Sequence, residues 1–566
     1  MAGGTAIAPT GGSSELATIL AGRDLRWYKG YQLRLILMLF LVLITSVTNG
    51  YDSSMMNGLQ SLDTWKSYFN NPQNHPKTFG LYTAILNIGG IAALPFGPFI
   101  ADRFGRRMGI FVGCGIMIVG CALQAGALNP GMFLAGRGIV GFGVNIAHLA
   151  APVLITELAF PTYRAPLTSV YNSLWYLGSI IAAWTTYGTF RINNQWGWRI
   201  PSILMALAPI VQFVAIWFIP ESPRWLINHG KTEQALDIIA KWHCDGDRND
   251  PLVEFEYAEM QEMIRAEHES KETTYASLFK TKGNRRRMRI VIAIAFFSQW
   301  SGNGLVSYYL SLILNSIGIT KQSDQTLFNG ILQIYNLFCA ASSGLLVDRA
   351  GRRPLFLAST GGMCLSFICW TISSAVYTNS SHTYDPACLA LHDGNKASCV
   401  ALDANKHAGH AVIAFIYLFY TAYNLAMSPL IVGYTVEIMP YSLRAKGLMM
   451  LQLGVTCAST FNQYTNPIAL DALGWKYYIC FCVFIAFEFV YCYLFVIETR
   501  GKNGILSLEE IGALFDGPAR WGFQKNPAVD GTAVDQENAP GLSKTASNAK
   551  DGDVVHIDDT EGAKRH

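Results

Sequence analysis

The sequence predicts an all-α membrane protein whose twelve transmembrane helices form two pseudo-symmetric six-helix bundles. The chain of 566 residues is 51% hydrophobic and only 14% charged, whereas soluble domains usually carry about 25% charged residues. The hexapeptide Asp-Arg-Phe-Gly-Arg-Arg, which begins at Asp102, returns at Asp348 as Asp-Arg-Ala-Gly-Arg-Arg, each time between two long apolar runs. Such a repeat indicates one membrane module used twice, which is the pattern of a secondary transporter.

Two further charged motifs occur in the same order in both halves. The segment Glu-Leu-Ala-Phe-Pro-Thr-Tyr-Arg from Glu157 corresponds to Glu-Ile-Met-Pro-Tyr-Ser-Leu-Arg from Glu437. Glu221 in Pro-Glu-Ser-Pro-Arg corresponds to Glu498 in Ile-Glu-Thr-Arg-Gly. The second half is longer between its first and second motifs, and the excess coincides with a polar insert at 378–408.

Twelve apolar runs of about 20 residues follow one another along the chain, each long enough to cross about 30 Å of hydrocarbon. The first run follows about 34 polar and small residues without a small-residue cleavage site, so we expect a retained span and not a signal peptide. The predicted spans are 35–53, 79–100, 109–128, 131–155, 168–190, 199–219, 288–316, 325–347, 354–377, 409–436, 447–470 and 475–497.

Basic residues gather in the loops on one side of this map, and the positive-inside rule makes that side cytosolic. We therefore expect a multi-pass plasma-membrane protein with both termini in the cytosol. The tail is rich in Gly, Ala, Asp, Asn and Lys without an apolar period, which predicts disorder. The expected parts are a cytosolic segment at 1–34, a six-helix bundle at 35–219, a cytosolic linker at 220–287, a second six-helix bundle at 288–497 with the extracellular insert 378–408, and a cytosolic tail at 498–566, largely disordered after 516.

The predicted extracellular insert carries two candidate modifications. Cys388 and Cys399 both lie in it, and an oxidising compartment favours a disulfide between them. Asn379-Ser-Ser is an N-glycosylation acceptor sequence, close to the membrane.

Charged residues at the predicted cytosolic ends of the helices form a candidate gate. Carboxylates and guanidiniums at one depth in both halves can pair across the halves and close this mouth. Exposed ion pairs contribute about 0–1 kcal/mol each, so a set of them can break and reform during a transport cycle. The alternative is that the basic residues only anchor the orientation of the helices. The predicted gate residues are Arg103, Arg107, Glu157, Arg164, Glu221, Arg349, Arg353, Glu437, Arg444 and Glu498.

Two opposite charges fall inside predicted spans. Asp52 ends the first span and Arg137 lies about six residues inside the fourth, so both belong to the outer half of the membrane. A charge within a span costs about 2.5–3.5 kcal/mol, and such residues usually pair and often serve ion pathways. Asp52 could instead be a helix-end residue that faces water. His148 and Glu488 also lie within spans, but a single histidine is more often a packing residue, and neither joins the predicted site.

Amide side chains recur on several spans, often beside aromatic residues. Gln299 and Asn303 are four residues apart on one helical face, with Tyr308 just beyond them. Amides donate and accept hydrogen bonds, which suits an uncharged, polyhydroxylated ligand whose apolar face an aromatic ring can cover. Amides that only hold helices together are the alternative. The predicted substrate-binding residues are Asn172, Gln299, Asn303, Tyr308, Asn336 and Asn462.

Together, these motifs over about residues 30–515 resemble the sugar porter branch of the major facilitator superfamily. Further support comes from Gly-Arg-Gly at 136–138 and Pro-Glu-Ser-Pro-Arg-Trp at 220–225. The resemblance implies two bundles that rock about a central sugar site, with short helices in the 220–287 linker. It places Asn172, Gln299, Asn336 and Asn462 where family members contact sugar. It also places Asp52 and Arg137 where proton-coupled members hold a carboxylate–arginine pair.

Departures from the family pattern point to a narrower resemblance. Hexose carriers usually read Gln-Gln-Leu-Ser-Gly-Ile-Asn in the seventh span, where this chain reads Ser-Gln-Trp-Ser-Gly-Asn-Gly from Ser298 to Gly304. Val432 replaces a tryptophan common in glucose carriers. Gly304 in place of the asparagine and Val432 in place of the tryptophan should both enlarge the cavity. The strings Gln-Trp-Ser-Gly-Asn from Gln299 and Gly-Tyr-Asp-Ser-Ser at 50–54 are similar to fungal lactose and cellodextrin permeases.

The sequence thus predicts proton-coupled uptake of a disaccharide of the lactose, cellobiose or cellodextrin type. A hexose or pentose transporter, a passive facilitator, and a sugar sensor that signals through its cytosolic regions are the alternatives. The expected partners are the sugar, protons and the lipid bilayer, and the long tail leaves room for cytosolic regulators. We expect no nucleic-acid partner, because such a partner has no evident role beside twelve membrane spans. We expect no enzymatic activity either, because no phosphate-binding GxxxxGK[ST] loop occurs. We also expect no metal and no cofactor.

Overall fold

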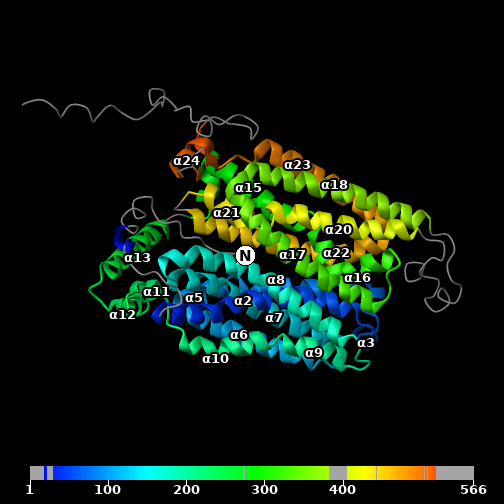
Figure 1. The fold of residues 1–566 in the computed structure, drawn as a ribbon, viewed down its shortest axis with the longest axis horizontal. Coiled ribbons are helices and arrows are strands. Elements are labelled where there is room, and N and C mark those ends of the chain that lie inside the picture. The colour runs from blue at the N-terminus through cyan, green and yellow to red at the C-terminus, as the bar shows by residue number, and fades with distance from the viewer. Residues whose placement is uncertain are drawn as a thin grey trace, which may run out of the picture.

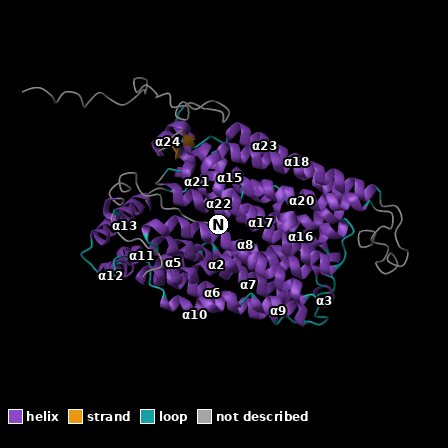
Figure 2. Ribbon diagram, viewed as in Figure 1, coloured by secondary structure: helices purple, strands orange, loops and turns teal. Residues whose placement is uncertain are grey.

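The computed structural model is almost entirely helical (Figure 2). The predicted disulfide cysteines, Cys388 and Cys399, lie outside the described residues, as do the side chains of Asn172 and Arg349, so these predictions stay predictions. The structure describes residues 18–21, 30–271, 274–380, 405–440, 443–501, 504–505 and 508–517.

The N-terminal half is a bundle of long helices that turn at prolines and capping residues. Pro130 opens α7 as its first residue, and the Asn129 side chain accepts a hydrogen bond of 2.8 Å from the Met132 N–H, both of which are typical of helix starts. α4 and α5 meet at a 46° bend beside Pro95, which cannot continue the helical hydrogen-bond ladder. The helices are α2 (Gly30–Ser61), α3 (Asp63–Tyr68), η1 (Pro72–Asn74), α4 (Pro76–Ala93), α5 (Phe96–Phe104), α6 (Arg106–Ala125), α7 (Pro130–Leu158), η2 (Pro161–Tyr163), α8 (Arg164–Thr189), α9 (Trp196–Leu204), α10 (Leu207–Ala215) and η3 (Ile216–Phe218).

The linker between the halves folds into short helices with an apolar core of their own. Ile239, Leu252 and Val253 pack with Phe160 of the N-terminal half in this core. The linker helices are α11 (Pro223–Asn228), α12 (Thr232–His243), α13 (Pro251–Lys271) and α14 (Ser277–Lys280).

The C-terminal half repeats the arrangement and ends in a short helix that packs back onto it. Ile511, Leu514 and Phe515 of this last helix are buried in the same apolar core as the C-terminal bundle. A two-stranded antiparallel ribbon, β1 with β2, precedes it. The elements are α15 (Lys282–Trp300), α16 (Asn303–Ser316), α17 (Gln322–Ala350), α18 (Arg352–Asn379), α20 (Lys406–Ala426), α21 (Leu430–Ile438), α22 (Arg444–Leu473), η6 (Gly474–Lys476), α23 (Tyr477–Phe495), β1 (Arg500–Gly501), β2 (Gly504–Ile505) and α24 (Leu508–Asp516).

Each of the twelve predicted spans coincides with one helix or with two or three consecutive helices. Among the described residues, eight helical stretches are long and apolar enough to cross a membrane, or nine if the bent pair α4–α5 is one span. Three further spans bring the count to twelve. One stretch contains both α22 and α23 and is therefore two spans, and α8 and α17 are long enough to span although they carry amides and hydroxyls. The twelve-helix fold follows.

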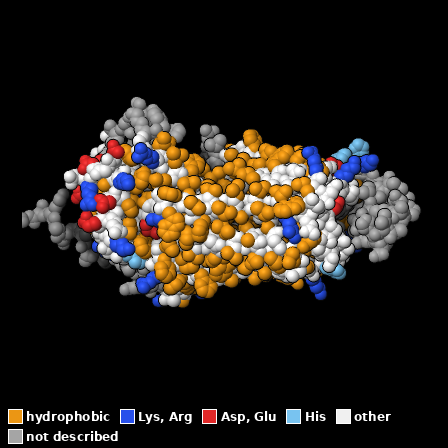
Figure 3. Space-filling model, turned by 90° about the horizontal axis from the view of Figure 1, so that it is seen from below, with side chains coloured by type: hydrophobic (Ala, Val, Ile, Leu, Met, Phe, Trp, Pro, Cys, Tyr) orange, Lys and Arg blue, Asp and Glu red, His pale blue; other side chains and the backbone are white. Residues whose placement is uncertain are grey.

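The two halves lie side by side, with the N-terminal half below and the C-terminal half above in Figure 1. On the face seen in Figure 3, an apolar band crosses the middle of the molecule and charged side chains gather toward its two ends, as a bilayer requires. The halves meet along α2 with α16, α4 with α22, and α8 with α17. We call the end that carries the linker helices and the two arginine-rich motifs the basic end, and the opposite one the far end.

Candidate functional site

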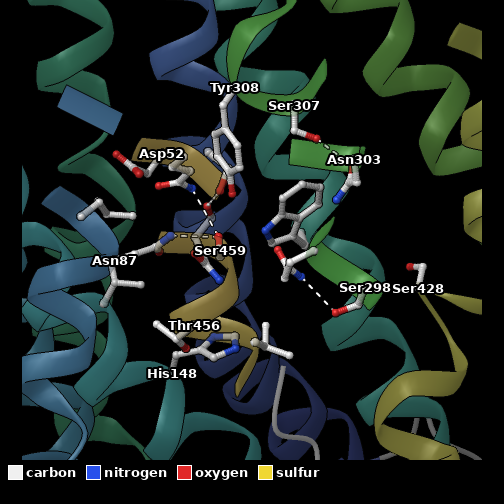
Figure 4. A pocket seen from close by; sticks show the side chains of 18 of the residues that line it. Asp52, Asn87, His148, Ser298, Asn303, Ser307, Tyr308, Ser428, Thr456 and Ser459 are labelled. Atoms are coloured by element: carbon white, nitrogen blue, oxygen red, sulfur yellow. Dashed lines mark hydrogen bonds between the residues drawn. The ribbon is translucent and has the colours of Figure 1, made fainter. Parts of the chain in front are cut away.

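A cavity of about 240 Å³ lies between the two halves and is lined by both. Figure 4 shows side chains from the two bundles pointing into this space. Its wall is formed largely by neutral polar groups interleaved with aromatic rings, together with one carboxylate and one guanidinium. The neutral polar and aromatic lining includes Asn49, Ser53, Asn87, Asn145, Trp175, Tyr176, Gln299, Asn303, Ser307, Tyr308, Gln333, Asn336, Tyr420, Tyr423, Gln452, Ser459 and Gln463.

Four of the predicted binding residues line the cavity: Gln299, Asn303, Tyr308 and Asn336. The Asn303 Nδ2 atom lies 3.3 Å from the Tyr423 hydroxyl, and its Oδ1 atom accepts a 3.0 Å hydrogen bond from Ser307. The Asn336 Oδ1 atom accepts from Asn424 at 3.3 Å. These amides are therefore held in place before any ligand binds. Asn172 lies on α8, but its side chain is outside the description.

Asn462 does not line the cavity, contrary to the position that the resemblance implies. Its side chain is buried, and its Nδ2 atom donates a 2.7 Å hydrogen bond to the backbone carbonyl of Gln299. Asn466, one turn further along α22, accepts a 2.9 Å hydrogen bond from the Tyr477 hydroxyl. On this helix the two amides hold neighbouring segments together, which is the interhelical role that amides also fill in membranes.

The prediction that Gly304 enlarges the cavity is wrong. A Cβ atom at this position would lie 2.4 Å from Asn462 Nδ2, so the Asn462 amide already fills the space that the missing side chain leaves. Val432, in contrast, does line the cavity. Only one of the two substitutions therefore adds room for a substrate.

Several lining residues were missed by the sequence reasoning, most of them in the N-terminal half or on α20 and α22. Asn87 of α4 donates a 3.0 Å hydrogen bond to Ser459 of α22 and so joins the two halves. Asn145 lies eight residues after Arg137 on the same face of α7, a helical spacing that could have identified it. His148, which was set aside from the sequence as a packing residue, does line the cavity, and its Nδ1 atom lies 2.8 Å from the Tyr171 hydroxyl.

Asp52 and Arg137 form an ion pair in the wall of the cavity. The Asp52 Oδ1 atom lies 3.3 Å from Arg137 Nη1, and both side chains are only 2% exposed. Asp52 is not a helix-end residue that faces water, because α2 continues to Ser61. The second Asp52 oxygen and Arg137 Nε have no hydrogen-bond partner among the described residues. The pair is thus buried, and its hydrogen-bonding groups are incompletely satisfied. Removal of either partner would leave the other charge buried and uncompensated, which is costly.

Hydrogen bonds between the halves cross the interface from the cavity toward the far end. Asn57, five residues beyond Asp52 on α2, donates to Asn329 of α17 at 3.3 Å. Tyr309 of α16 packs into the N-terminal core and its hydroxyl bonds to both Thr83 and the carbonyl of Gln463. These contacts join the two halves on the far side of the Asp52 position.

At the basic end each half carries the same ion-pair lock. Arg106 Nε lies 3.3 Å from Glu157 Oε2 in the N-terminal half, and Arg352 Nη2 lies 2.9 Å from Glu437 Oε1 in the C-terminal half. Both Nε and Nη2 of Arg352 bond to Glu437, so the second lock is bidentate. A hydroxyl group just after the sixth or twelfth span completes each lock. Ser222 donates a hydrogen bond to Glu157 and Thr499 donates one to Glu437, both at 2.5 Å.

A second carboxylate caps each arginine-rich turn. Glu221 accepts hydrogen bonds from the Arg106 and Arg107 N–H groups at 3.0 and 3.2 Å, and Glu498 accepts from the two equivalent N–H groups at 3.0 Å each. Both carboxylates thus sit at a helix N-terminus, where backbone donors and the helix dipole favour an anion. Burial raises the pKa of Glu221 above its ordinary value, although these N–H groups act in the opposite direction.

Glycine is required in these turns for two reasons. Gly105 and Gly351 adopt φ values of +104° and +83°, which other residues rarely adopt. A Cβ atom on Gly105 would also lie 2.2 Å from Glu221 Oε2. The repeated hexapeptide therefore encodes a turn that receives the carboxylate of the third repeated motif, Glu221 in one half and Glu498 in the other.

The predicted gate is corrected in two respects. The ion pairs described here join residues within one half, whereas pairing across the halves was expected. In the two arginine-rich turns, the described arginines that pair with carboxylates are Arg106 and Arg352. Arg107 and Arg353 instead donate to the carbonyls of Trp217 and Tyr493 at 3.0 and 3.2 Å, and Arg103 is exposed. These two locks each join residues of a single bundle.

Two further gate residues, one in each half, follow the second motif. Arg164 binds two linker carboxylates, Glu256 at 3.3 Å and Glu259 at 3.7 Å, and so attaches α13 to the start of α8. Arg444 is buried at the start of α22.

An all-helical membrane protein whose two halves enclose a polar cavity has the architecture of a secondary transporter. The chain belongs to the family described as Sugar (and other) transporter, and residues 38–515 match that family. It is a transporter family and not a family of enzymes.

Related proteins support this assignment over most of the chain. The High-affinity glucose transporter of Kluyveromyces lactis is 28% identical over 477 residues, which cover 84% of this chain and 84% of that protein. The MFS-type transporter criB of Aspergillus cristatus is 30% identical over 82% of this chain and 90% of that protein. A partially occluded inward open structure of the xylose transporter XylE from E. coli has a TM-score of 0.64 at 21% identity, over 83% of this chain and 99% of that chain. The narrower resemblance to lactose and cellodextrin permeases gains no support from these relatives.

Proposed function

We propose that the protein imports a glucose-like monosaccharide across the plasma membrane together with protons. The observation that carries the substrate class is the cavity itself. Its volume of about 240 Å³ lies below the range of about 300–1,000 Å³ that is usual for ligand pockets, which favours one sugar ring over two. Its amides and hydroxyls can donate to and accept from sugar hydroxyls, and its aromatic rings offer apolar faces. The glucose transporters among the relatives point to the same substrate class.

The Asp52–Arg137 pair supports proton coupling. Both residues border the cavity, and the pair has no other described charge partner. Protonation of Asp52 would remove the charge that holds Arg137, and a proton can bias the transport cycle only through such a difference between states. Sugar bound beside the pair would then favour the protonated form. Facilitated diffusion without protons is the competing mechanism.

A disaccharide substrate is the second candidate, and the observation that favours it is Val432. This small side chain lines the cavity where the resemblance leads one to expect tryptophan. The support is weaker than it was on sequence alone, because the second expected source of space, at Gly304, is filled.

The test is uptake of labelled glucose, xylose, lactose and cellobiose by yeast that lacks sugar transporters. We expect glucose to be taken up much faster than either disaccharide, and the reverse order would overturn the monosaccharide assignment. Gln299→Ala should reduce glucose uptake about 5- to 10-fold at unchanged surface abundance, as expected for a lost hydrogen bond of about 1–1.5 kcal/mol. Unchanged kinetics in that variant would remove Gln299 from the site. Sugar addition to weakly buffered cells should raise external pH, and a constant pH with uptake insensitive to an uncoupler would exclude proton coupling.

A further inference from the structure

The seventh span is broken beside the cavity, and α22 holds the break with two hydrogen bonds. α15 ends at Trp300 and α16 begins at Asn303, so the carbonyl of Gln299 lies at a helix end, where carbonyls lose their intrahelical partners. Asn462 Nδ2 donates to this carbonyl at 2.7 Å. One turn earlier on α22, the Ala458 carbonyl accepts from Trp300 Nε1 at 3.1 Å.

The position of the Asn462 amide depends on the glycine at 304. A Cβ atom there would lie 2.4 Å from Asn462 Nδ2 and 3.2 Å from its Cγ. Real Cβ atoms do not approach so closely, so a larger residue at 304 and this placement of Asn462 exclude each other. The two positions are therefore coupled through space although they are 158 residues apart.

The break determines which side chains reach the cavity. Gln299 lies immediately before it and Asn303 immediately after it, and both line the cavity, whereas Asn462 does not. Asn303 is then held by Ser307 and Tyr423, of which Tyr423 also bonds to the Ser298 carbonyl at 2.9 Å.

We propose that Asn462 and Gly304 form a matched pair that fixes the break in the seventh span, so that Asn462 is a positioning residue and Asn303 presents the amide to the substrate. This inference rests on the proposed function, since it assigns roles within the same site. It differs from what the family resemblance implies, namely that Asn462 itself contacts sugar. The required group is an N–H donor, because the partner is a carbonyl oxygen.

Double-variant kinetics test the coupling. Asn462→Ala and Gly304→Ala should each lower the ratio of maximal uptake rate to KM about 5- to 10-fold at equal surface abundance, since each removes the hydrogen bond to Gln299. The double variant should be no worse than the poorer single variant, because alanine at 462 makes room for alanine at 304. A loss equal to the product of the two single losses would show that the sites act independently and would overturn the inference. Gly344→Ala is the matched control, since nothing lies within 4 Å of a Cβ there, and it should stay within about 2-fold of wild type.

A second comparison separates positioning from direct contact. An ionised aspartate at 462 keeps acceptor oxygens and loses the donor, so positioning predicts that Asn462→Asp loses at least as much uptake as Asn462→Ala at high pH and recovers, relative to wild type, as the pH falls and the carboxyl gains an O–H donor. Near wild-type uptake in Asn462→Asp that does not change with pH relative to wild type would indicate a sugar contact through the oxygen and refute positioning. Singly deoxygenated glucoses add a further readout: positioning leaves the relative preference among them intact, whereas direct contact abolishes the penalty for one hydroxyl.

Failure of the proposed function can be distinguished from failure of this inference. Absence of monosaccharide uptake by the wild-type protein would refute the proposed function alone. The thermal midpoints of the purified single and double variants then still report the coupling between positions 304 and 462. Additive midpoint shifts would refute the matched pair, and non-additive shifts would support it.

Discussion

The bidentate lock of the C-terminal half should contribute more to stability than its counterpart in the N-terminal half. Glu437 is 8% exposed and bonds to Arg352 through two guanidinium nitrogens at 2.9–3.2 Å. Glu157 has one contact of 3.3 Å to Arg106, whose side chain is 15% exposed. Removal of one partner of a buried ion pair costs about 3–5 kcal/mol, because the other charge is left uncompensated. Loss of a single hydrogen bond to a charged group costs about 1.5–3 kcal/mol.

The perturbation is Glu437→Gln against Glu157→Gln, each of which keeps the shape of the side chain. We expect the larger fall in thermal midpoint of the purified protein for Glu437→Gln. The combined change Arg352→Gln with Glu437→Gln should be less harmful than Arg352→Gln alone, since it leaves no unpaired charge. Equal midpoints for the two glutamine variants, or additive losses in the combined variant, would refute the reasoning from lock geometry.

Three further predictions concern other parts of the molecule. Asp52→Asn should abolish the sugar-dependent rise in external pH while it spares exchange across a sugar gradient, and a normal pH signal would leave Asp52 as a structural residue only. Gly105→Ala should lower the thermal midpoint, since a backbone with φ of +104° costs a residue with a Cβ atom about 1–3 kcal/mol and the new Cβ displaces Glu221; an unshifted midpoint would contradict the turn geometry. Burial opposes ionisation of Glu256, but the charge and the 2.6 Å hydrogen bond of His243, together with the charge of Arg164, outweigh it and lower the pKa of Glu256 below its ordinary 4.5. A lowered carboxyl pKa stabilises the linker above pH 4.5 and this contribution is lost as pH falls, so hydrogen exchange in α12 and α13 should accelerate on acidification in wild type and lose this dependence in Glu256→Gln.

The secondary structure was largely predictable, because hydrocarbon requires each backbone polar group to be satisfied within its own helix. Runs of about 20 apolar residues therefore became helices at the expected places, and the repeated motifs became equivalent turns. Gln299 and Asn303 were expected on one helical face from their spacing of four residues, but the helix breaks between them, so the break and not the spacing brings both to the cavity. Asp52 and Arg137 could be paired because neither is stable alone within a span.

The sequence by itself determined the membrane architecture, the twofold repeat and the chemical character of the site, since these depend on periodicity and composition along one chain segment. Only the tertiary structure decided which amides face the cavity. Asn462 bonds to a carbonyl 163 residues away because Gly304 leaves space for it, and no local pattern encodes that contact. Likewise, Arg106 rather than Arg103 or Arg107 binds a carboxylate, because the direction of a side chain at a helix start depends on the turn and on the neighbouring helices that receive it.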